Sequence, residues 1–301
     1  MKRHYFAGAT ALTLASALLA PAQQAPNPVE AAAQTKATEF TTAELFKPSS
    51  ERTGQDLILL QEHKPLYVRV DQRLSWTDNA FFTGNKQDDV SYFAGVAAGF
   101  DTLTESGVDL KLEGSFSGIR YHRFSQLDYN YYGGTAGIGY RAGGFRIGVD
   151  YQPLQFMDRD FANDLVLYHD FGLSLGYQGA FSPQCGYFIG VRGSRVFGYP
   201  NEYDSWRIAP NLGVYYQPRH WFSAVAGVSG SHTSYDNYFQ ALTGQDRADR
   251  LVSGILSFNF TPKRWLNFGV LVQYTDNDSS LNVSDYKAFS VTPNATLRFR
   301  F

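Results

Sequence analysis

From residue 66 to the C-terminus, apolar and polar residues alternate in a series of short runs. In the first run, 66–76, the even-numbered positions are mainly apolar and the odd-numbered positions are mainly polar. Successive side chains of a β-strand point to opposite faces, so a period of two predicts strands with one apolar and one polar face. We predict about twelve strands, at 66–76, 92–100, 108–116, 132–140, 145–151, 171–177, 187–191, 206–216, 222–228, 252–260, 266–274 and 286–301.

The connections between these runs alternate between two kinds. Short turns are predicted at 102–107, 142–144, 182–186, 218–220 and 262–264. Longer polar segments are predicted at 78–89, 120–130, 153–164, 198–204, 231–250 and 276–285. This order favours a closed antiparallel transmembrane β-barrel with short periplasmic turns and longer extracellular loops. A soluble secreted β-protein shows the same residue alternation and is kept as an alternative.

The composition is compatible with such a barrel. The chain has 301 residues, 44% of them hydrophobic and 18% charged, and its mean hydropathy is −0.29. A barrel strand needs an apolar residue only at every second position, so this average does not exclude a membrane protein. The net charge of −2 argues against nucleic-acid binding. The single Cys185 excludes a disulfide framework and a multi-cysteine metal site, and we expect neither metal nor cofactor.

The N-terminus has the features of a secretory leader. Lys2 and Arg3 precede an apolar run at 5–20, and Ala20 and Ala22 supply small residues at a cleavage site. We therefore predict a signal peptide at 1–22, a largely irregular periplasmic N-terminal segment at 23–64 and the barrel at 65–301. For the segment 23–64 we favour a solvated tether over a plug.

The last strand ends the chain on alternating apolar residues, Leu297, Phe299 and Phe301. This ending resembles the C-terminal signal of bacterial outer-membrane β-barrels, which implies that the barrel-assembly machinery recognises these three residues. Pro293 lies in the same strand and cannot donate a backbone hydrogen bond, so we expect a bulge or a strand end there.

A second resemblance is narrower. Trp76, Asp78, Asn79 and Phe81 follow the aromatic-x-Asp-Asn-aliphatic stretch at the start of the beta-barrel porin 2 type. The resemblance implies a bacterial outer-membrane location, in contact with membrane lipid and lipopolysaccharide, and for some members a link to polysaccharide export. It brings no catalytic residues.

Charged residues on the polar faces are the candidate pore lining: Arg69, Asp71, Arg73, Lys111, Glu113, Arg146, Asp150, Asp170, Arg192 and Arg207. Rings of basic residues favour anions, so one hypothesis is a porin-like channel for passive diffusion of small polar solutes, including anions or saccharides. The alternative is a structural or adhesive barrel whose paired charges fill the lumen. Glycines on the polar faces favour the open lumen, because they leave room.

Enzymatic chemistry has weaker support. His122, His169 and His232 have no convincing catalytic partners in the sequence, and neither HExxH nor GxSxG occurs. A lipid-modifying barrel enzyme is therefore the less favoured alternative, and we expect a monomer without catalytic activity.

The acidic stretch 276–280 and the pair Asp78 and Asn79 could bind Ca²⁺ or bridge to lipopolysaccharide, but tight turns require the same residues.

Overall fold

The computed structural model describes residues 64–240, 245–281 and 284–301, which form twelve β-strands. The strands are β1 (Leu66–Thr77), β2 (Asp89–Leu103), β3 (Val108–Tyr121), β4 (Tyr129–Ala142), β5 (Phe145–Asp158), β6 (Asp164–Ser182), β7 (Cys185–Tyr199), β8 (Ser205–Arg219), β9 (Phe222–Gln240), β10 (Gln245–Lys263), β11 (Leu266–Ser279) and β12 (Tyr286–Arg300). The predicted signal peptide and most of the predicted periplasmic segment, residues 1–63, lie outside the described residues.

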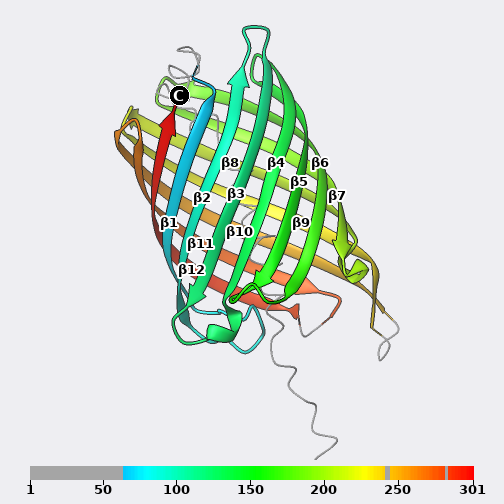
Figure 1. Ribbon diagram of the computed structural model, residues 1–301. Helices are drawn as coiled ribbons and strands as arrows, with labels where there is room; N and C mark the ends of the chain where they lie inside the picture. Colours follow the sequence, from blue (N-terminus) through cyan, green and yellow to red (C-terminus); the bar gives the residue numbers. More distant parts are fainter. Residues whose placement is uncertain (1–63, 241–244, 282–283) are drawn as a thin grey trace, which may run out of the picture.

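Each strand pairs antiparallel with the next, and β1 pairs with β12 to close the barrel (Figure 1). At the closure Val68 lies opposite Phe299 and Trp76 lies opposite Val291. Closure leaves no unpaired sheet edge, which a lipid environment requires. The predicted fold class is therefore confirmed, including the pairing of the last strand with both the first strand and β11.

The two ends of the barrel differ in their connections. The turn rim carries the short links between β2 and β3, β4 and β5, β6 and β7, β8 and β9, and β10 and β11. The loop rim carries the other six links and two short 3₁₀ helices, η2 (Ser125–Leu127) and η3 (Asn201–Tyr203). The Phe301 amide donates to the Leu66 carbonyl at 2.9 Å, so the C-terminus lies at the turn rim (Figure 1). Within the described residues, no helix is long and apolar enough to cross a membrane.

Several connections at the loop rim are shorter than predicted. Residues 153–158 belong to β5, and β6 begins at Asp164 rather than at 171. The predicted loop 231–250 is largely strand, because β9 runs to Gln240 and β10 begins at Gln245. The strands thus extend beyond the segments in which the alternation of apolar and polar residues is clear.

Pro293 lies in the middle of β12 without a bulge, so the prediction made for it was wrong. It pairs with Val270 of β11, whereas the pairing of β12 with β1 is interrupted between Asn294 and Val291 and resumes in the same register. Pro153 and Pro210 each interrupt the pairing on one side in the same way. A proline lacks one donor, and these strands tolerate that loss by omitting pairs on one side only.

The outer face of the barrel is apolar, with aromatic residues towards both rims. Leu112, Leu173 and Leu212 are each more than half exposed on this face. At the turn rim Trp221 packs against Phe260 and Trp265 stacks on Phe299, with ring centroids 5.3 and 6.0 Å apart. Aromatic rings at this position suit a membrane–water interface.

Candidate pore and inner wall

All ten predicted pore-lining residues lie on the inner wall. Along each strand they occupy the positions that alternate with the exposed apolar residues, as Arg146 does between Phe145 and Ile147. The structure brings them into clusters with other inward side chains that the prediction did not include.

The first cluster joins β12, β1, β2 and β3. Arg69 forms ion pairs with Asp71 at 2.7 Å and with Glu113 at 3.3 Å. Tyr67 donates a hydrogen bond to Glu113, and Thr296 donates to Asp71 at 2.8 Å. Nearer the turn rim, Arg300 pairs with Asp101 at 2.6 Å. The closure of the barrel is therefore lined by a continuous polar network.

A second cluster surrounds Arg192 of β7. Its Nη2 atom lies 2.6 Å from Asp150 of β5 and 2.9 Å from Asp170 of β6. The side chain is only 10% exposed, so both carboxylates compensate a largely buried charge. Nearer the turn rim, Asp109 of β3 accepts from Arg141 at 2.9 Å and from Arg146 at 3.2 Å.

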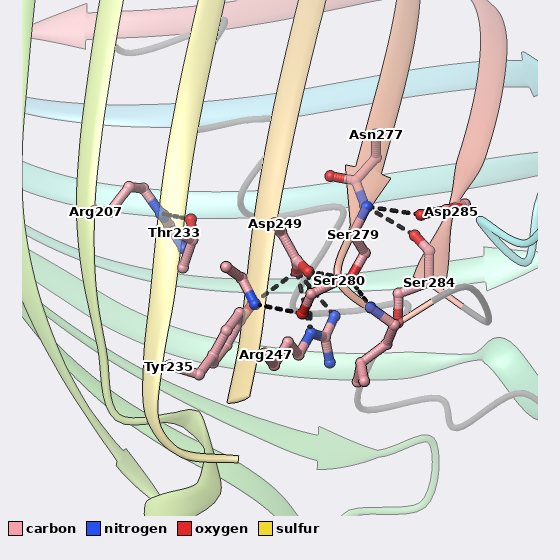
Figure 2. Close-up of polar contacts among 12 residues, drawn as sticks. Arg207, Thr233, Tyr235, Arg247, Asp249, Asn277, Ser279, Ser280, Ser284 and Asp285 are labelled. Atoms are coloured by element: carbon pink, nitrogen blue, oxygen red, sulfur yellow. Dashed lines mark hydrogen bonds and ion pairs between the residues drawn. The ribbon is translucent and has the colours of Figure 1, made fainter. Parts of the chain in front are cut away.

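A third cluster lies at the loop rim around Asp249 of β10 (Figure 2). Asp249 pairs with Arg247 at 3.0 Å and accepts hydrogen bonds from Ser279 of β11 at 2.5 Å and from Tyr235 of β9 at 3.3 Å. The Arg247 guanidinium also lies over the Tyr235 ring, 4.7 Å from its centroid. This cluster ties three strands together where β9 and β10 extend beyond the predicted limits.

The remaining predicted cations have different neighbours. Arg207 donates to the Thr233 hydroxyl at 3.2 Å (Figure 2). The Arg73 guanidinium lies over the Phe93 ring, 4.5 Å from its centroid. Lys111 lies opposite Asp101 in the pairing of β2 and β3. Inward cations outnumber inward carboxylates among the described residues: the cations are Arg69, Arg73, Lys111, Arg141, Arg146, Arg192, Arg207, Arg247, Arg298 and Arg300, and the carboxylates are Asp71, Asp89, Asp101, Asp109, Glu113, Asp150, Asp158, Asp170 and Asp249.

The inward ion pairs described above join neighbouring parts of the barrel wall rather than opposite sides of the lumen. Four pairs join strands two apart, namely Arg69 with Glu113, Arg146 with Asp109, Arg192 with Asp150 and Arg300 with Asp101. The other pairs join adjacent strands or lie within one strand. Opposite walls of a twelve-stranded barrel are six strands apart. These pairs hold the charged groups against the wall and do not bridge the lumen.

The inward glycines do not simply leave empty space. A Cβ atom added at Gly172 would meet the Arg192 guanidinium, and one added at Gly213 would lie 2.4 Å from the Phe188 ring. At Gly99 it would lie 2.7 Å from the Tyr67 ring. Large inward side chains therefore lie flat across the glycines. This packing weakens the argument that glycines indicate an open lumen.

The inner wall also carries apolar clusters that the sequence analysis missed. Near the loop rim, inward residues of β2 to β6 pack with Tyr203 of η3: Phe93, Ile119, Tyr129, Tyr131, Leu154, Phe156 and Val166. A second cluster of Phe188, Val225 and Ile255 lies on β7, β9 and β10. The only sequence signal for the first cluster is the apolar residues that break the alternation between 153 and 170.

Comparison with known proteins supports the fold. A crystal structure of an outer membrane channel from Pseudomonas putida F1 matches with a TM-score of 0.51 and 13% identity, over 78% of this chain and 96% of that chain. The chain shares the β-barrel fold of this outer membrane channel. The KdgM porin in complex with disordered oligogalacturonate (TM-score 0.43, 10% identity, 77% and 99% of the two chains) and the NanC porin (0.45, 9%, 76% and 98%) are also similar. No protein-family model matches the chain, and no curated protein matches it.

The residues that resemble the start of the beta-barrel porin 2 type lie at the loop rim of the barrel. Asp78 accepts a hydrogen bond from the Phe289 amide at 2.6 Å, and buried Asn79 donates to the carbonyls of Thr83 and Lys287. Phe81 packs against Phe124, with ring centroids 4.5 Å apart. These contacts give the motif a structural role in the loop between β1 and β2, while membership of the beta-barrel porin 2 type stays a prediction.

The three histidines considered for catalysis, His122, His169 and His232, lie on different strands or loops and do not form a common site. His169 faces outward and bonds the Tyr151 hydroxyl at 2.7 Å. His232 was predicted to lie in a loop, but it lies in β9 and faces outward. His122 follows β3 at the loop rim. Among the described residues, no serine hydroxyl is hydrogen-bonded to a histidine, and no group of three or more His, Cys, Asp or Glu could hold a metal ion.

Proposed function

We propose that this barrel is a monomeric, non-enzymatic porin-like channel for passive diffusion of small polar solutes, with a preference for anions. The observation that carries the proposal is the course of the inward ion pairs between described residues, which join strands at most two apart. An eight-stranded barrel is just filled by its side chains, whereas barrels of 16 or more strands leave an aqueous channel. At twelve strands, wall-bound charges favour a passage.

The excess of inward cations supports the anion preference, because basic groups along a pore attract anions and repel cations. The apolar cluster around Phe156 narrows the lumen on the side of β2 to β6 near the loop rim. Saccharides are a second solute class, and the inward hydroxyl and amide groups of the half-buried Ser257 and Asn259 on β10 would suit them.

Planar-bilayer recordings of the full-length protein test this function. We expect discrete conductance steps and, in a KCl gradient, a reversal potential displaced towards that of chloride. Arg207→Glu on the inner wall should move the reversal potential towards that of potassium. Arg250→Glu makes the same charge change on the outer face of β10 and should leave it unchanged. Absence of conductance steps at every voltage would overturn the channel and favour the filled barrel.

A further inference from the structure

Among the side chains that the structure describes, the girdle of aromatic residues on the outer face near the loop rim is interrupted at β9 and β10. The other ten strands contribute an outward aromatic residue there: Trp76, Tyr92, Phe116, Tyr132, Tyr151, Phe171, Phe197, Trp206, Tyr274 and Phe289. On β9 and β10 the outward positions between the level of Trp206 and the level of Tyr274 include His232 and Arg250. Polar groups therefore replace aromatic groups in this sector.

His232, Ser234 and Arg250 form a compact outward patch. Arg250 lies directly opposite His232, and Ser234 is two residues further along β9. Directly paired residues have Cβ atoms about 4.5–5.5 Å apart and diagonal neighbours about 7–8 Å apart, so one tetrahedral anion could reach all three side chains. All three residues are exposed, and their side chains form no hydrogen bond or ion pair among the described residues.

The depth of the patch points to a lipid headgroup. An arginine that faces lipid is strongly destabilising at the bilayer midplane and nearly neutral near the interface. Towards the midplane, the next outward residues are Val252 and, two rungs below His232, Val228, both about half exposed and apolar. Arg250 thus lies where the apolar belt ends, at the level of lipid phosphates.

At the turn rim, the outward residues of β9 and β10 are aromatic rather than polar. Their outward residues there are Phe222 and Phe260, which continue the aromatic ring of that rim. The polar patch therefore faces only the leaflet at the loop rim. In an outer membrane whose long loops are extracellular, that leaflet contains lipopolysaccharide.

Another outward arginine, Arg195, differs from Arg250 because other residues of the protein compensate its charge. Arg195 pairs with Asp236 at 2.5 Å and lies between the rings of Phe197 and Trp206, about 5 Å from each centroid. Arg250 has Asp278 of β11 as its other register partner, but no ion pair joins them. Arg250 is therefore the cation in this sector that is available to an external anion.

We propose that Arg250, His232 and Ser234 bind a phosphate group of lipopolysaccharide in the outer leaflet. The guanidinium and the imidazole donate to phosphate oxygens, the Ser234 hydroxyl donates to a third, and the acyl chains lie along Val228 and Val252. This binding involves the outer face alone and does not depend on whether the lumen conducts.

Titration of the full-length protein in phosphatidylcholine nanodiscs with purified lipid A tests the site. A charge-assisted hydrogen bond contributes roughly 1.5–3 kcal/mol, so Arg250→Gln should weaken binding about tenfold or more. Ser234→Ala should weaken binding less, and Asp278→Asn should tighten it, because the competing carboxylate is neutralised. Arg219→Gln removes an exposed arginine at the turn rim and should leave binding unchanged.

Three results would overturn the proposal. One is unchanged binding by Arg250→Gln and Ser234→Ala when both retain the heat-modifiable gel shift of a closed barrel. Another is equal binding of dephosphorylated lipid A. The third is full displacement of lipid A by an equimolar amount of phosphatidylglycerol, which would assign the patch to any anionic headgroup. The readout is binding rather than conductance, so failure here is distinct from failure of the proposed channel.

Discussion

The inner and outer walls of the barrel both carry arginines, but they hold them in different ways. Inside, Arg192 is 10% exposed and contacts two carboxylates from neighbouring strands. Outside, Arg250 is exposed at the edge of the apolar belt and has no ion pair among the described residues. The inner wall compensates the charge of Arg192 with carboxylates, whereas the outer wall places Arg250 where lipid headgroups can solvate it.

The largest effect should come from moving a charge across the wall. Leu256 and Ser257 are adjacent on β10, Leu256 outward in the apolar belt and Ser257 inward. Leu256→Arg should lower the free energy of unfolding by about 2–4 kcal/mol, because the guanidinium enters lipid near the midplane. Ser257→Arg should cost clearly less. Urea unfolding in lipid vesicles measures both, and equal losses would contradict the assignment of the two faces.

A smaller effect is expected when one inner ion pair is broken. Asp170→Asn leaves the buried Arg192 with Asp150 as its only carboxylate partner and should lower the free energy of unfolding by about 1–3 kcal/mol. Asp276→Asn breaks the exposed outer pair with Lys287, 3.1 Å in length, and should cause no measurable change. If the outer variant proves the more damaging, the contrast between the two walls is wrong.

The smallest effect concerns the closure between β1 and β12. Where Pro293 interrupts the backbone pairing, the inward hydroxyls of Ser75 and Thr292 form a hydrogen bond of 2.8 Å. Thr292→Val should lower the free energy of unfolding by about 0.5–1.5 kcal/mol. Ser257→Ala removes an inner-wall hydroxyl where the backbone pairing is uninterrupted, and it should cost less. A larger loss from Ser257→Ala would mean that the Ser75–Thr292 bond does not support the closure.

The sequence predicts the strands best where lipid dictates every outward residue. All twelve strands were predicted, since Leu173 and Leu175 of β6, for example, must be apolar to face the membrane. The start of β6 was missed because Val166 and Tyr168 face inward into an apolar cluster and break the alternation. The segment 231–250 was assigned to a loop because polar residues such as His232 and Arg250 occupy outward positions near the rim.

The inner wall was only partly predictable. Period two places Arg192, Asp150 and Asp170 on the inner face, but their meeting depends on the stagger between β5, β6 and β7, which the sequence does not encode locally. Arg247 was missed because a register shift between Asp246 and Ala248 precedes the regular part of β10. The assembly role of Leu297, Phe299 and Phe301 stays a prediction, although Phe299 and Phe301 are exposed at the turn rim.

The pairing of β1 with β12 also bears on the order of folding. The other eleven pairings join strands that are consecutive in the chain, whereas this one joins residues such as Tyr67 and Arg300 from opposite ends of it. Contacts between distant residues carry the largest loop-closure entropy, so hairpins can form early and the ends meet late. Until that last step, β1 and β12 are open edges able to pair with another chain. A proline in one of them reduces the backbone donors that such a wrong partner could use.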